Sequence, residues 1–94
     1  MAQRLTVEFF VKAGMEADFE ALALPAAARV RADDPGCLQY HFFHALGDST
    51  KYVLVEAWDT AENLAAHGAS PAIAGMRELG PLLAERSILH RYED

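Results

Sequence analysis

The sequence predicts one α+β domain, spanning residues 1–94, whose elements follow the ferredoxin-like order β-α-β-β-α-β. Three observations predict this class. The length suits a single domain. Four short segments have the apolar alternation or the aromatic content of strands, and two longer ones repeat apolar residues every three or four positions. Turn-forming Gly, Pro, Asp and Ser residues separate these segments.

The first third of the chain predicts a strand followed by a helix. In residues 5–11 every second residue is apolar, as in a strand with one buried face. Residues 15–32 are typical of an amphipathic helix. Its apolar stripe consists of Phe19, Leu22, Ala23, Ala26 and Val30. Pro25 lies inside this helix and removes one backbone donor, which predicts a kink or a split.

The middle of the chain predicts a hairpin. Residues 33–36, Asp-Asp-Pro-Gly, end the helix in a turn. Residues 37–46 form an aromatic-rich strand, and residues 52–58 form the next strand after a loop that contains Gly47.

The last third predicts a helix in two parts and a final strand. Asp59 is the expected N-cap, Glu62 completes a capping box, and the helix runs to about residue 69. Ser70 is expected to cap a restart in which Pro71 takes the first helical position. Residues 87–92 form the last strand.

Both predicted helices cover the same face of the sheet, so the other face would be open in a monomer. The sequence is 52% hydrophobic, and too many large apolar residues fall on that face to be left in water. A second copy packed against it by a twofold axis would cover it. The sequence therefore predicts a homodimer.

Composition excludes several classes of protein. The net charge is −6 and no run of Lys or Arg occurs, which argues against nucleic-acid binding. No segment approaches 18 apolar residues, so no membrane span is expected. Cys37 is the single cysteine, and residues 1–5 lack the apolar run of a secretion signal. These features favour a reducing cytoplasm.

Bound cofactors are also not expected. The four histidines form no helical pair and no triad with a nearby carboxylate, which argues against a metal site. The six glycines are dispersed rather than gathered in a phosphate-binding loop, which argues against bound NAD or ATP.

Four segments together resemble the antibiotic biosynthesis monooxygenase family. They are PGCLQY at residues 35–40, VLVEAW at 53–58, LAAHGAS at 64–70 and GPLL at 80–83. The resemblance implies a dimeric α+β barrel with one pocket in each subunit. It also implies oxidation of a hydroquinone or polyphenol with molecular oxygen, without metal, haem or flavin. Because one fold hosts many reactions, the fold carries over more safely than the chemistry.

The pair His67 and Glu56 is the candidate catalytic centre. An unperturbed imidazole has a pKa of about 6.5, so His67 could accept a phenolic proton near neutral pH. The alternative is a packed histidine bonded to a carbonyl or carboxylate. Glu56 could orient His67 or bind the substrate, because a carboxylate in a partly buried cavity needs a partner. The alternative for Glu56 is a purely structural role.

Trp58 and Tyr40 are the candidate substrate-binding residues. Trp58 shares a strand face with Glu56 and could form a wall for a flat ring, or simply fill the core. Tyr40 could hydrogen-bond a quinol oxygen, or be half-buried with its hydroxyl in water. The other three histidines are expected at the surface or an interface, and Cys37 is expected to be buried and inert.

Three functions remain open. The first is a cofactor-independent monooxygenase acting on a hydroquinone-like or polyphenolic aromatic. The second is an isomerase or tautomerase of a small dicarbonyl compound; a phosphate on its substrate would require Arg or Lys in the pocket. The candidates for that cation are Lys12, Arg77, Arg86 and Arg91. The third is a dimer that binds a small ligand without chemistry.

Overall fold

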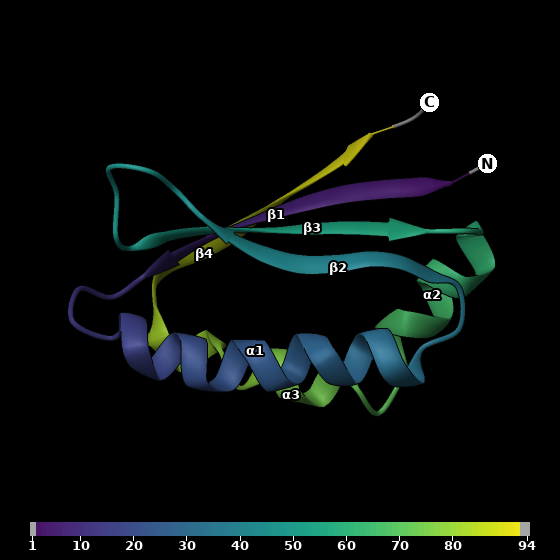
Figure 1. Ribbon diagram of the computed structural model, residues 1–94, viewed down its shortest axis with the longest axis horizontal. Helices are drawn as coiled ribbons and strands as arrows, with labels where there is room; N and C mark the ends of the chain where they lie inside the picture. Colours follow the sequence, from purple (N-terminus) through teal and green to yellow (C-terminus); the bar gives the residue numbers. More distant parts are fainter. Residues whose placement is uncertain (1, 93–94) are drawn as a thin grey trace.

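The computed structural model describes residues 2–92 and confirms the ferredoxin-like α+β prediction. The elements are β1 (Gln3–Val11), α1 (Glu16–Asp33), β2 (Cys37–His44), β3 (Lys51–Trp58), α2 (Ala61–Gly68), α3 (Ile73–Arg77), a 3₁₀ turn (Gly80–Leu82) and β4 (Leu83–Tyr92). The strands form one antiparallel sheet in the order β2-β3-β1-β4. All the helices lie on one side of that sheet (Figure 1).

Helix α1 continues through Pro25, so the predicted split is wrong. The side chain of Pro25 points to solvent, while α1 buries residues on both sides of it. These buried residues are Phe19, Ala23, Ala26, Ala27 and Val30. A proline inside a helix costs about 3 kcal/mol, and we infer that packing of this face on the sheet offsets that cost. Leu22, which was expected in the stripe, lies at its exposed border.

The predicted starts of two helices and one strand in the last third need correction. Thr60, not Asp59, caps α2, because its hydroxyl accepts a hydrogen bond of 3.1 Å from the backbone N–H of Asn63. Ser70 does not cap α3, which begins at Ile73; its hydroxyl donates to a distant carboxylate described below. Strand β4 begins at residue 83 rather than 87, because pairing with β1 continues to Val11.

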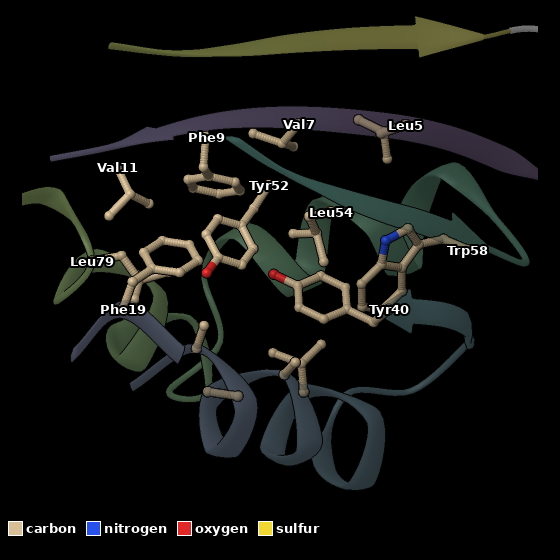
Figure 2. Packing of buried hydrophobic residues seen from close by; sticks show 14 residues of the cluster. Leu5, Val7, Phe9, Val11, Phe19, Tyr40, Tyr52, Leu54, Trp58 and Leu79 are labelled. Atoms are coloured by element: carbon tan, nitrogen blue, oxygen red, sulfur yellow. The ribbon is translucent and has the colours of Figure 1, made fainter. Parts of the chain in front are cut away.

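The core between the sheet and the helices contains two aromatic groups. Near the start of α1, the ring of Phe19 lies 5.7 Å from that of Phe9 and 4.7 Å from that of Tyr52. At the end of β3, Trp58 packs edge-on to Tyr40 with ring centroids 6.2 Å apart. Figure 2 shows the two groups at opposite ends of the core. The Trp58 group lies beside the candidate site.

The opposite face of the sheet is uncovered in the single chain. Phe43 of β2 pairs with Val53 of β3, and Ile88 of β4 pairs with Glu8 of β1, all on this open face. The side chains of Phe43 and Ile88 are 51% and 45% exposed. The alternation of strands therefore leaves apolar side chains in water on one face, as the sequence predicts.

Candidate functional site

A cavity of about 440 Å³ lies between the sheet and helices α2 and α3. Most of its lining is apolar and comes from β1, β3 and the two helices, including Leu5, Val7, Leu54, Leu64 and Met76. Its polar lining residues are Gln3, Tyr40, Glu56, His67 and Arg91. An apolar chamber with a few convergent polar groups is typical of a small-molecule site.

His67 lies on α2 and is 5% exposed. Its Nδ1 is 2.6 Å from Oδ2 of Asp34, which also accepts a hydrogen bond of 2.9 Å from the hydroxyl of Ser70. Because an ionised carboxylate only accepts hydrogen bonds, this contact assigns the ring proton to Nδ1. In the neutral ring, Nε2 then carries the lone pair and can accept a proton.

Glu56 faces the other nitrogen of His67. Its Oε1 lies 4.0 Å from Nε2 and accepts a hydrogen bond of 3.1 Å from the indole N–H of Trp58. Burial raises the pKa of the Glu56 carboxyl, against smaller opposing effects of the Trp58 hydrogen bond and of the charges of His67 and Arg91. The neutral acid is therefore favoured more than in an exposed glutamate.

Two aromatic rings hold His67 in place. Trp58 stacks on the imidazole at a centroid distance of 4.5 Å, and Tyr40 meets it edge-on at 5.2 Å. Tyr40 is 1% exposed, so the half-buried alternative is wrong, and burial with the nearby charge of Glu56 raises the pKa of its hydroxyl. Tyr40 lines the cavity, whereas fully buried Trp58 is not among the described residues that line it.

The turn after α1 brings Asp34 under α2. The backbone N–H of Asp34 ends the helix by donating to the carbonyl of Val30 at 3.0 Å. Gly36 follows with φ of +79°, and its carbonyl accepts a hydrogen bond of 2.9 Å from the N–H of Asp59. A Cβ at Gly36 would collide with the side chains of Asp59 and Asn63. Only glycine fits this turn without displacing the start of α2.

The structure brings the four sequence-predicted residues together: His67, Glu56, Trp58 and Tyr40 are in mutual contact or share the cavity. Sequence reasoning missed Asp34, which it treated as part of a turn. The only signal was its position directly before Pro-Gly at the end of a helix. No local pattern links Asp34 to a histidine 33 positions later.

The remaining candidates lie elsewhere. The ring of His44 stacks on that of Tyr52, and His90 pairs with Glu8 on the open face. Cys37 is partly buried, and burial raises the pKa of its thiol. Within residues 2–92, no three His, Cys, Asp or Glu side chains are grouped as metal ligands would be. Over the same residues, no helix has both the length and the apolarity to cross a membrane.

Fold and site together define a class of protein: a ferredoxin-like α+β domain with a buried histidine between two carboxylates at an apolar cavity. The model of the family described as antibiotic biosynthesis monooxygenase matches residues 3–79. The chain therefore belongs to this family, and the family resemblance predicted from the sequence is confirmed; three of the four segments lie within the matched residues. Proteins of this family act on small substrates and commonly form dimers.

Solved structures show the same fold. A candidate antibiotic biosynthesis monooxygenase from Caulobacter crescentus CB15 is 24% identical with a TM-score of 0.92, covering 99% of this chain and 89% of its own. One from Bordetella bronchiseptica is 25% identical with a TM-score of 0.82, covering 99% and 96%. Rv0793 from Mycobacterium tuberculosis is 19% identical with a TM-score of 0.87, covering 100% and 95%. No curated protein matches the chain.

Proposed function

We propose that the protein is a cofactor-independent monooxygenase that oxidises a small hydroquinone-like or polyphenolic aromatic with molecular oxygen. The observation that carries this proposal is the orientation of His67. Asp34 holds its Nδ1 at 2.6 Å, which leaves Nε2 as the basic nitrogen beside the cavity. The family membership supports oxygenase chemistry.

In this proposal His67 removes a phenolic proton. The electron-rich phenolate passes one electron to oxygen, and the resulting radical pair combines within the cavity to form a C–O bond. Cleavage of the O–O bond leaves one oxygen atom on the ring and releases the other as water. The hydroquinone supplies all the electrons, so no external reductant is needed. Asp34 stabilises the imidazolium that forms on His67.

The surrounding residues have separate roles in the proposal. Tyr40 lines the cavity and contacts the substrate ring. Trp58 stacks on His67 and positions it rather than forming a wall. Glu56 offers a carboxyl group whose proton can bond to a substrate oxygen, because burial raises its pKa.

Oxygen uptake by metal-stripped protein with a panel of hydroquinones and polyphenols tests the proposal, with the protein-free rate subtracted. The His67→Ala variant should lose about 100-fold or more of the rate, as expected when a general base is removed. Because that change leaves buried Asp34 with only the hydroxyl of Ser70 as a donor, His67→Gln provides a second variant whose amide can still donate. His44→Ala is the matched control, since His44 is exposed and away from the cavity.

Uptake at the background rate across the panel, or full activity in both His67 variants, would contradict this mechanism.

One observation favours a second candidate, an isomerase or tautomerase of a small dicarbonyl compound. Glu56 and His67 face each other at 4.0 Å and could move a proton between two substrate positions without oxygen. Turnover of a dicarbonyl substrate at an unchanged rate under nitrogen would identify that activity. Ligand recovered unchanged from the protein would favour the binding function.

A further inference from the structure

A row of four side chains crosses the sheet beneath the cavity. Tyr40 pairs with Glu56, Glu56 with Leu5, and Leu5 with Arg91, so each strand contributes one residue. Paired residues in an antiparallel sheet project from the same face. All four residues line the cavity. The row therefore runs from an aromatic and acidic end at β2 and β3 to a cationic end at β4.

Arg91 is the only lysine or arginine of residues 2–92 that lines this cavity. Within that range no carboxylate forms an ion pair with it. Its charge nevertheless acts inside the cavity, because it is one of the effects that favour ionised Glu56. Of the four cations that the sequence left open for binding an anionic group, the structure thus selects Arg91.

We propose that Arg91 recognises an anionic group on the substrate and that the physiological substrate is an aromatic carboxylic acid. The carboxylate binds the guanidinium at β4, and the ring hydroxyl points to His67. The placement of the ring hydroxyl at His67 rests on the function proposed above. Arginine suits the task because its planar fork of donors matches a carboxylate in two parallel hydrogen bonds.

The dimensions of the sheet fit a single-ring acid. Glu56 and Arg91 lie two strands apart, and neighbouring strands are spaced by about 4.8 Å. The two backbones are thus about 10 Å apart, and the long arginine side chain shortens the distance to be spanned. A dihydroxybenzoate can therefore lie along the row with its carboxylate at one end and a hydroxyl at the other.

The net charge of the whole protein does not explain a preference for an acidic substrate. The net charge of −6 disfavours anions in general, so a preference for an acid must come from a local cation. Burial, by raising the pKa of Glu56, favours its neutral form and lessens repulsion of a bound anion.

Anaerobic titration calorimetry with hydroquinone and with 2,5-dihydroxybenzoate tests the inference, because the two probes differ only by one carboxylate. The unchanged protein should bind the acid about tenfold more tightly, the effect expected of a charged hydrogen bond. Arg91→Met should remove this preference, and Arg91→Lys should retain part of it. Arg86→Met is the matched control on the same strand, since Arg86 does not line the cavity.

Equal affinity for the two probes, no binding of the acid at millimolar concentration, or a preference that persists in Arg91→Met would each overturn the inference. These outcomes are separate from failure of the proposed function, because binding without oxygen requires no turnover. Oxygen uptake with neutral hydroquinone that depends on His67 but does not change in Arg91→Met would leave the oxygenase proposal intact.

Discussion

Asp34 determines which ring nitrogen of His67 carries the proton, although the two residues are far apart in the sequence. It is 8% exposed and bonds both the imidazole and Ser70. The sequence identified His67, Glu56, Trp58 and Tyr40 as candidates, because a family motif or strand alternation marks each of them. Asp34 and Arg91 could not be assigned in the same way. Their roles depend on tertiary contacts that only the turn after α1 and the pairing of β4 create.

The buried carboxyl of Glu56 makes stability depend on pH in a defined direction. Below its ordinary pKa of 4.5, Glu56 is neutral in both the folded and the unfolded chain. As the pH rises, the unfolded chain loses this proton first, because the folded pKa is raised. The folded protein then holds more protons, so the contribution of Glu56 to the free energy of unfolding falls until its folded pKa is passed.

Glu56→Gln removes this titration while keeping an acceptor for Trp58. We expect the variant to gain stability relative to the unchanged protein as the pH rises above the ordinary glutamate pKa of 4.5, measured by urea unfolding at each pH. Glu62→Gln, at an exposed position of α2, is the control and should follow the unchanged protein. A constant difference between Glu56→Gln and the unchanged protein as the pH rises would contradict the expected proton linkage.

At the scale of elements, the sequence predicted the order and type of the elements better than their ends, which include the start of β4 as well as the cap of α2. The alternation in β1 identified its buried face correctly, because one misplaced residue would reverse a whole face. The α2 cap was wrong by one residue, since Asp59 and Thr60 can both cap a helix, and it is the hydroxyl of Thr60 that accepts the hydrogen bond from the backbone N–H of Asn63. Asp59 instead accepts a hydrogen bond of 2.8 Å from the side chain of Asn63.

The connection between α1 and β2 depends on Gly36. Gly36→Ala should lower the free energy of unfolding by about 2 kcal/mol or more, since a positive φ costs an alanine about 1–2 kcal/mol and its Cβ meets Asp59 and Asn63. Gly14→Ala is the matched control, with φ of +86° but no neighbour within 4 Å. Denaturant unfolding of both variants measures the difference. Equal losses would mean that contact with α2 adds nothing to the backbone cost.

At the scale of the whole molecule, the open sheet face of a single chain leaves apolar side chains in contact with water. Phe43, Val53, Val55 and Ile88 lie on it, and a second copy related by a twofold axis would remove them from water. Strand alternation was sufficient to predict this face. The partner itself stays a prediction.

We expect the protein to sediment as a dimer at micromolar concentration, and Val55→Glu to shift it toward a monomer by burying a charge at the centre of that face. Leu24→Glu is the control, because Leu24 is 60% exposed on the helical side. Analytical ultracentrifugation with all three proteins checks this. A monomer in the unchanged protein, or a dimer unaffected by Val55→Glu, would contradict an interface on the open face.

The stacking of Trp58 on His67 has an optical consequence. The chain contains one tryptophan, and its ring lies 4.5 Å from the imidazole at 29°. A charged imidazole in contact with an excited indole quenches its emission. All tryptophan fluorescence of this protein therefore arises beside the imidazole of His67. The single tryptophan thus provides an intrinsic fluorescence signal from beside the residue to which the proposed chemistry transfers a proton.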